Sequence, residues 1–521
     1  MPGLRGRFAG LWNVRAARGH VPFLVLLVAA TAVRLAAMTG CRPALWFNDS
    51  YEYVAGALRP EPYVVRPSGY SFFLRVLEPF HSFELVVLLQ HALGLAIGVA
   101  VYALLLRLGA PAWAAAIGAA PQLLDAYQIE LEHLVLSETV FTALLMTAVL
   151  CLLWRRSISV PAAAVAGIAL ALAAVTRSVG LPLALAATIW LLARRPAWRS
   201  MAAFGLTLAV PVLAYCSWHR AEHGGFATSG STGVFLYSRT ATFADCAVMK
   251  PPAELRPLCP TEPTDQRNPP SDYIWHGDSP LAGVPGPIFD PAKEELARDF
   301  AVHAVLAQPL DYLDVVGRDF MRTFESRLED YPSRSVAERY LFGSPTPSMT
   351  RKDREAADLR AYEHGEFATT AHEPMAGWLV TYQRHAALPA PALGLLLALG
   401  LVGTACAFLR VRSLAAPLLL LSGLATLTLL LPPATAGFDY RYVPPAFPFL
   451  GAAAVAAGLC LVRLVGLVGR GGSVVGDTTA QPDEPARPER PTPGEEPTRP
   501  DEPVDGGART GPIPGTGIPV S

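Results

Sequence analysis

Charged side chains are scarce in this chain. Asp, Glu, Lys and Arg make up 16% of its 521 residues, whereas soluble proteins carry about 25%. Apolar residues reach 52%, and the mean hydropathy is positive. This composition excludes a string of soluble domains and indicates an integral membrane protein.

Metal-ligand motifs are also missing. The seven cysteines form no CxxC or Cys/His spacing, so no metal-binding residue is assigned. Cys246 and Cys259 lie in a segment expected outside the membrane, separated by a Pro-rich loop. Two nearby thiols on an oxidising face can close a loop, which predicts a disulfide between them. The net charge of −1 averages over two aqueous faces and a lipid phase, and nucleic acid is not among the expected partners.

Long apolar runs are present instead. A bilayer core of about 30 Å requires about 20 mainly apolar residues per helix. This criterion predicts an all-α polytopic membrane protein with about ten transmembrane helices, near residues 21–39, 84–106, 111–128, 135–154, 160–176, 179–193, 200–218, 388–409, 413–433 and 443–466. Because further spans follow the first, it is interpreted as an uncleaved helix and not as a signal peptide.

Basic residues mark alternate connections between these spans. The short loops with arginine and without acids contain Arg107, Arg155, Arg156, Arg194, Arg195, Arg199, Arg410, Arg412 and Arg470. The positive-inside rule makes these loops cytoplasmic, together with both termini, in a multi-pass protein of the cell membrane. The remaining loops carry the acids and are predicted to be extracytoplasmic.

Five regions follow from this topology. They are a cytoplasmic N-terminus (1–20), an N-terminal transmembrane module (21–218) with a first outer loop (40–83), an extracytoplasmic segment (219–387), C-terminal transmembrane helices (388–466) and a cytoplasmic tail (467–521). The tail is rich in Pro, Glu, Arg, Gly and Thr and is predicted to be disordered. Within the extracytoplasmic segment, residues 291–324 have helical periodicity, with Pro309 starting a second helix.

The first outer loop begins with "WFNDSYEYVAGAL" at residues 46–58. Asp49 as N-cap with Glu52 three residues later fits a capping box, in which both acids have structural roles. Asp49 could instead act on a substrate. Hydrogen bonds from helix amides would then compete with that role, because they favour the ionised carboxylate and weaken it as a base.

Four other sites place ionisable groups near span ends on the outer side, where such groups usually face a cavity or a partner. Each has a structural alternative. Glu138 could complement a helix dipole, Arg177 and Arg34 could extend to the membrane interface, and Arg441 could pair only with Asp439. The arginines could equally bind a lipid phosphate, since a guanidinium has several donors and a permanent charge.

The order of these motifs resembles the GT-C class of membrane glycosyltransferases, in particular the branch similar to protein mannosyltransferases. The resemblance covers roughly residues 20–465. It rests on Asp49, Tyr53, Ala57, Pro67, Gly69 and Tyr70 in the first outer loop, on Ser-Glu at Glu138, and on Thr176-Arg177 and Arg441-Tyr442 before apolar helices. One departure is that Asp49 is followed by Ser50, where many members of this branch have Glu.

The resemblance implies a hexosyl- or pentosyltransferase of the cell envelope that uses a polyprenyl-phosphate-linked sugar. Asp49 would be the catalytic base of an inverting transfer to a glycan, lipid or protein acceptor. The residues implied to bind the donor phosphate or substrate are Arg177, Arg441, Glu138, Tyr53, Tyr442 and Arg34. Glu138 and Asp49 could also hold a divalent cation, although no metal motif supports one.

Three other classes of function are alternatives at this point. A transporter or flippase for lipid-linked sugars would also use outer arginines, but the halves show no repeat. A ligase or polymerase of lipid-linked glycans would present similar chemistry at the same face. A non-catalytic receptor would explain the large outer segment but not polar residues at several helix ends.

Overall fold

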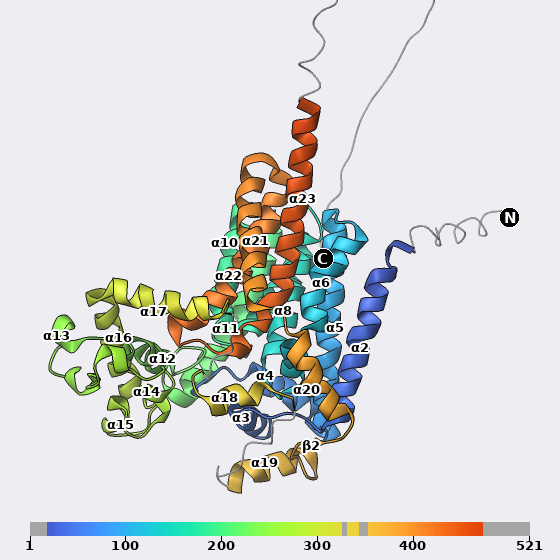
Figure 1. The fold of residues 1–521 in the computed structure, drawn as a ribbon. Helices are drawn as coiled ribbons and strands as arrows, with labels where there is room; N and C mark the ends of the chain where they lie inside the picture. The colour runs from blue at the N-terminus through green and yellow to red at the C-terminus, as the bar shows by residue number, and fades with distance from the viewer. Residues whose placement is uncertain (1–17, 326–330, 343–352, 472–521) are drawn as a thin grey trace, which may run out of the picture. The chain divides into compact units, whose positions relative to one another are not determined.

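The computed structural model describes residues 18–325, 331–342 and 353–471. Helices dominate these residues, and Figure 1 shows α5 (Phe83–Leu108), α22 (Arg412–Thr435) and α23 (Phe447–Gly471) as long, roughly parallel elements. The predicted all-α membrane class is therefore confirmed. The predictions for the N-terminus (1–20) and for a disordered tail (467–521) fall largely outside the described residues.

Six candidate spans among the described residues are long and apolar enough to cross a membrane. They are α2 (Val21–Gly40), α5, α11 (Trp198–His223), α21 (Ala390–Arg410), α22 and the stretch Tyr440–Val465 that includes most of α23. Four shorter apolar helices occupy the positions of the other expected spans: α6 (Ala112–Leu124), α8 (Glu138–Leu153), α9 (Val160–Thr176) and α10 (Gly180–Ala193). The count of ten spans stays a prediction.

Two expected spans have a different end or start from the predicted one, for local reasons. Span 111–128 ends at Leu124, because Asp125 caps a separate helix, α7 (Ala126–His133), and accepts a hydrogen bond from the Gln128 amide at 2.9 Å. The 3₁₀ turn η5 (Tyr440–Tyr442) precedes the expected span 443–466, and a second one, η6 (Pro444–Ala446), occupies its start. Proline lacks the amide hydrogen that a helix interior requires, so α23 starts only at Phe447.

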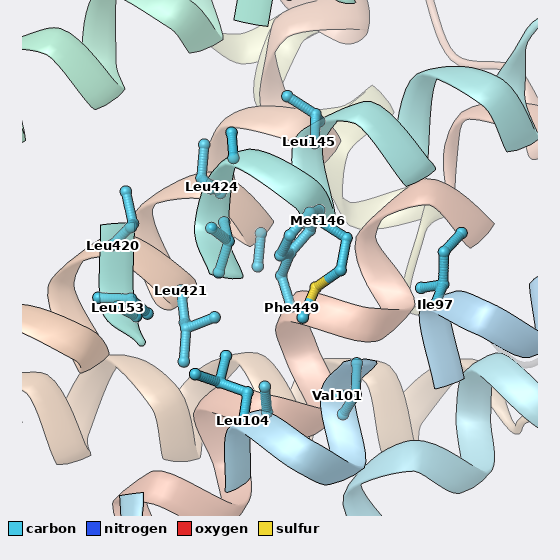
Figure 2. Close-up of a cluster of buried hydrophobic side chains, with 14 of the residues drawn as sticks. Ile97, Val101, Leu104, Leu145, Met146, Leu153, Leu420, Leu421, Leu424 and Phe449 are labelled. Carbon is cyan, nitrogen blue, oxygen red and sulfur yellow. The ribbon is translucent and has the colours of Figure 1, made fainter. Parts of the chain in front are cut away.

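The largest hydrophobic core lies among the apolar helices. It joins α5 with α8, α22 and α23. Figure 2 shows part of it, with labelled side chains Ile97, Val101, Leu104, Leu145, Met146, Leu153, Leu420, Leu421, Leu424 and Phe449. Close packing of this kind fixes which helix ends become neighbours.

The basic connections lie near one another. Arg107 in the last turn of α5 donates to the Trp154 carbonyl after α8 at 2.9 Å, and Arg194 after α10 donates to the Arg156 carbonyl at 3.2 Å. These ends of the helices are called the basic end below. The first outer loop, with β1 (Cys41–Arg42), α3 (Asn48–Leu58), α4 (Gly69–Leu77) and η1 (Glu78–Phe80), belongs to the opposite end.

The segment between α11 and α21 adds short elements at that opposite end. In chain order they are α12 (Thr232–Ala241), α13 (Cys246–Met249), η2 (Arg256–Leu258), η3 (Thr264–Gln266), α14 (Asp272–Trp275), α15 (Pro280–Gly283), α16 (Pro291–Ala307), α17 (Pro309–Arg322), α18 (Arg334–Ala337), η4 (Glu338–Tyr340), α19 (Asp353–Glu363), β2 (Thr370–Ala371) and α20 (Met375–Ala386). Strands β1 and β2 pair antiparallel, which ties the first outer loop to the chain before α20.

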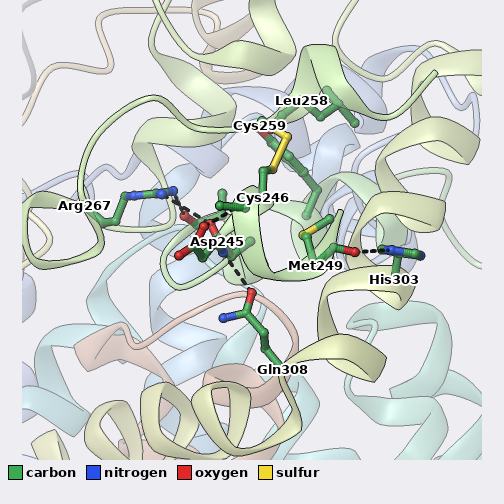
Figure 3. Close-up of a disulfide and its surroundings, with 12 residues drawn as sticks. Asp245, Cys246, Met249, Leu258, Cys259, Arg267, His303 and Gln308 are labelled. Atoms are coloured by element: carbon green, nitrogen blue, oxygen red, sulfur yellow. Dashed lines mark hydrogen bonds between the residues drawn. A yellow bond between two sulfur atoms is a disulfide. The ribbon is translucent and has the colours of Figure 1, made fainter. Parts of the chain in front are cut away.

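Cys246 and Cys259 are joined by a disulfide with an S–S distance of 2.01 Å. Figure 3 shows it beside Asp245, whose amide donates to Gln308 at 2.9 Å. The two helices predicted over 291–324 are confirmed as α16 and α17. Helix α16 packs on α12, and α17 packs on α22.

Candidate active site

Asp49 lies in the first turn of α3 and does not cap it. Phe47 occupies the N-cap position, and its amide donates to the Ser50 hydroxyl at 3.0 Å. The capping-box role considered for Asp49 and Glu52 is therefore wrong. Because Ser50 serves the helix start, the Asp49 carboxylate is left for other partners.

The start of α3 is fixed beside the start of α8. The Leu45 amide donates to the His133 carbonyl at 3.0 Å, and the Val135 amide donates to the Leu45 carbonyl at 3.2 Å. These two bonds hold the chain before Asp49 against the chain before Glu138. Two acids that are 89 positions apart in the sequence thus belong to one site.

Two guanidinium groups hold Asp49. Its Oδ2 accepts from Arg441 Nη1 at 2.6 Å, and its Oδ1 lies 3.0 Å from Arg66 Nη1. Arg66 also reaches Glu52, with Nη2 to Oε2 at 3.1 Å. Burial alone would raise the pKa of the Asp49 carboxyl, but Arg441 and Arg66 outweigh burial and hold this pKa well below its usual range.

Glu138 and Arg177 form the second half of the site. Glu138 is the first residue of α8, and its fully buried carboxylate forms an ion pair with Arg177, which follows the last residue of α9. The predicted span begins at residue 135, which is about one turn before the start of α8 at Glu138. Arg177 Nη1 and the Tyr53 hydroxyl each donate to the Ser137 hydroxyl oxygen at 3.1 Å, which connects α9 and α3 to the same point.

A glycine allows α4 to approach the end of α9. A Cβ at Gly69 would lie 2.5 Å from the Val175 carbonyl oxygen and 2.7 Å from Thr176 Oγ1. Any other residue at position 69 would push the first outer loop away from Arg177. The Pro-Gly-Tyr element of the sequence therefore has a packing role here, and Tyr70 adds a hydrogen bond to Gln90 at 2.7 Å.

Arg441 links the two halves. Its Nε lies 3.2 Å from Asp439 and 3.8 Å from Glu138, so the expected Asp439–Arg441 pair exists alongside the Asp49 contact. The guanidinium centre also lies 4.7 Å from the Phe47 ring centroid and 5.2 Å from that of Tyr442. Aromatic faces of this kind attract a guanidinium and restrict its plane.

Asp439 is oriented by the outer segment. Its Oδ1 accepts from the Tyr340 hydroxyl at 2.5 Å, and Arg339 next to Tyr340 donates to Asn48. Burial raises the pKa of the Asp439 carboxyl, although the Arg441 charge opposes this rise. Among the described residues, η4 thus brings the outer segment to the site.

The cluster is largely buried but open at one side. Exposed fractions of the side chains are 12% for Arg441, 14% for Asp49, 15% for Arg177 and 17% for Arg66, against 0% for Glu138. A small pocket adjoins Arg441, lined also by Tyr127, Glu130, Leu131, Tyr340, Tyr440 and Pro444. Charges held in such a place interact more strongly than on an exposed surface.

No protein-family model and no curated protein matches this chain. One solved structure that does is the archaeal oligosaccharyltransferase AglB from Archaeoglobus fulgidus, in complex with an inhibitory peptide and a dolichol-phosphate. The match covers 88% of this chain and 52% of that one, with 14% identity and a TM-score of 0.38. This chain spans about half the length of that structure, and so distant a likeness assigns neither family nor activity.

The carboxylates of the site do not form a cation cage. Within 18–325, 331–342 and 353–471, no group of three or more His, Cys, Asp or Glu side chains is arranged to hold a metal ion. Guanidinium groups contact the Asp49 and Glu138 carboxylates instead.

Arg34 belongs to a different cluster from the other predicted phosphate ligands. Its guanidinium is buried in α2 and binds Glu132 through two bonds, Nε to Oε2 at 2.7 Å and Nη2 to Oε1 at 2.8 Å. Glu132 also contacts His91 at 2.9 Å, and His91 contacts His133 at 3.0 Å. The arginine neither extends to the interface nor joins Asp49, but connects α2 with α7 and α5.

Replacing Arg34 with Met is expected to destabilise the protein by about 3–5 kcal/mol, because the Glu132 carboxylate would stay buried without its counter-charge. The free energy of unfolding, measured in one detergent, checks this. Arg42→Met is the matched control: its pair with Glu84 has side chains 53% and 38% exposed, so the loss should stay below about 1 kcal/mol. If Arg34→Met kept normal stability but bound polyprenyl phosphate more weakly, Arg34 would be a ligand of the donor phosphate after all.

Two residues of the site were missed by sequence reasoning, and one was assigned only a structural role. Arg66 directly precedes Pro67 of the first outer loop, and the feature that could have indicated it is an arginine within an acid-rich outer loop. Nothing in the sequence indicates Tyr340 as a site residue, since it lies about 100 positions from its partner Asp439. Glu52 was interpreted as a helix-start acid, yet it holds Arg66.

Proposed function

We propose that this cluster transfers a sugar from a polyprenyl-phosphate donor to an acceptor hydroxyl, with inversion at the anomeric carbon. The observation that carries the proposal is the contact of Asp49 with both Arg441 and Arg66, beside the Arg177–Glu138 pair. It combines a carboxylate that can accept a proton with fixed cations that can bind a phosphate, at the ends of apolar helices.

Donor binding would change the partners of the arginines. A phosphate group offers guanidinium the same paired oxygen geometry as a carboxylate. When it takes Arg441 and Arg177, Asp49 loses its strongest counter-charge, and the pKa of its carboxyl rises towards the ordinary value. The site thus keeps Asp49 a weak base until a donor arrives, and converts it to a stronger one afterwards.

During the transfer, the acceptor oxygen forms a bond to the anomeric carbon, and the bond from that carbon to the phosphate oxygen breaks. Asp49 takes the proton of the acceptor hydroxyl, and polyprenyl phosphate leaves with the additional negative charge. Arg441 and Arg177 stabilise that charge more in the transition state than in the ground state, which is the condition for raising kcat.

The basic test needs no knowledge of the natural acceptor. Purified protein is incubated with a polyprenyl-phosphate sugar, and water serves as a slow acceptor. We expect free sugar and polyprenyl phosphate in equal amounts, with the inverted anomeric configuration by NMR. Retained configuration would contradict the inverting mechanism, and movement of intact donor across a liposome bilayer without cleavage would favour a flippase.

The release of Asp49 from Arg441 on donor binding predicts a specific pH dependence. Activity falls as pH drops through the pKa of the base, and kcat/KM reports the free enzyme whereas kcat reports the donor complex. Because arginines hold the pKa of Asp49 low in the free protein, the acid limb of kcat should lie at higher pH than that of kcat/KM. Both are measured between about pH 4 and 8; the acid limb of kcat should fall inside this range and that of kcat/KM below it. Coincident limbs would contradict this step.

A further inference from the structure

Helix α17 carries an apolar stripe that its protein contacts do not cover. Leu310, Leu313 and Met321 are 77%, 61% and 55% exposed, and Leu306 at the end of α16 is 77% exposed. With Gly317, the three apolar positions of α17 recur at spacings of three and four residues, within an arc of about 80° on the helix. Contiguous exposed apolar side chains of this kind mark an interaction surface.

The other faces of α17 either pack against the protein or carry charged side chains. Val315, Val316 and Asp319 are buried against the molecule. Next to the apolar stripe lies a polar face, where Asp314 and Arg318 form an exposed ion pair at 2.9 Å. The stripe therefore lies between the packed face and the polar face of one amphipathic helix.

Contacts at both ends of α17 set its depth. At its start, the Tyr312 hydroxyl donates to the Ala434 carbonyl at 2.9 Å, one residue before the end of α22. Just past its end, the Phe324 ring would lie 3.4 Å from a Cβ at Gly394, the fifth residue of α21. At a rise of about 1.5 Å per residue, Gly394 is roughly 6 Å inside that helix.

The helix also lies crosswise to the apolar bundle, as Figure 1 shows for α17 and α22. Leu395, next to Gly394 on α21, is 60% exposed and belongs to the surface that a membrane-spanning helix presents to lipid. The stripe of α17 continues this surface. A crosswise amphipathic helix at the outer ends of spans has the geometry of an interfacial helix.

We propose that α17 lies in the membrane interface, with Leu306, Leu310, Leu313 and Met321 inserted among the lipid acyl chains at the headgroup boundary. Asp314 and Arg318 then face the headgroups and water. The helix fixes the outer segment to the bilayer and, through Tyr312, supports the end of α22. The loop that carries Asp439 and Arg441 begins two residues after Ala434.

Photo-crosslinking distinguishes lipid from a protein occupant. Benzoylphenylalanine is incorporated at position 310 in place of Leu, and the protein is irradiated in native membranes and in phosphatidylglycerol/phosphatidylcholine nanodiscs. Mass spectrometry should find a phospholipid adduct. Position 314 on the polar face is the matched control and should give roughly ten times less adduct.

A positive control makes a negative result decisive. Position 402 on α21 is 58% exposed on a candidate span, so it reports lipid contact under the same conditions. A lipid adduct at 402 with none at 310 would overturn the proposal. A crosslinked dimer from 310 in native membranes would also overturn it and would make the stripe an interface between copies. None of these outcomes depends on sugar transfer, so the proposed function is tested separately.

Discussion

Asp49→Asn is expected to lower kcat for donor cleavage or transfer by about 10²–10⁴-fold, the usual contribution of a positioned general base. Asparagine keeps the size of the side chain and an oxygen that Arg441 can still reach, so the fold should be retained. What it lacks is the ability to take the acceptor proton. Initial rates of sugar release at saturating donor measure this effect.

The donor KM provides a second signature of the same variant. Asp49 competes with the donor phosphate for Arg441, and its amide would compete less. The KM should therefore stay unchanged or fall while kcat drops, which separates lost chemistry from lost binding.

Glu52→Gln is the matched control, since Glu52 lies on the same helix and holds Arg66, whereas the Asp49 carboxylate binds Arg441. It should lose much less activity. If Asp49→Asn kept the kcat of the unmodified protein at equal membrane levels, Asp49 would not be the base.

Most of the predicted site residues meet because the sequence indicates helix ends well. Glu138, Arg177 and Arg441 each stand where an apolar run starts or stops, and alternate run ends must share one side of a membrane. Their common side could therefore be predicted before any contact was known. Their pairing could not, because it depends on which ends the packed core brings together.

Arg34 and Asp125 show what sequence cannot supply. The apolar run around Arg34 indicates that this residue lies within a membrane-spanning helix. Its partner Glu132 is 98 positions away in the sequence, and the packing of α7 against α2 brings the two together. Asp125 appeared to lie within one continuous span. Its carboxylate instead caps α7 and also accepts from the Leu388 amide at 2.7 Å, a tertiary contact that favours ending the helix there.

Arg441→Gln is expected to lower kcat by about 10²–10³-fold, which is the cost of removing one preorganised donor to a developing charge. The donor KM should rise as well, because the phosphate loses a guanidinium in both ground and transition states. Arg441→Lys keeps the charge without the planar fork that matches phosphate oxygens. Its loss should be intermediate, and this graded series is measured at saturating donor.

The same substitution should also act on Asp49. Without Arg441, only Arg66 among its two direct partners still opposes the effect of burial on the Asp49 carboxyl. The pKa of Asp49 should then rise, so the acid limb of kcat/KM moves to higher pH and approaches that of kcat. Arg339→Gln is the control, since Arg339 borders the site through a hydrogen bond to Asn48. An unshifted limb in Arg441→Gln, with kcat still reduced, would leave Arg441 a phosphate ligand but separate it from the control of the base.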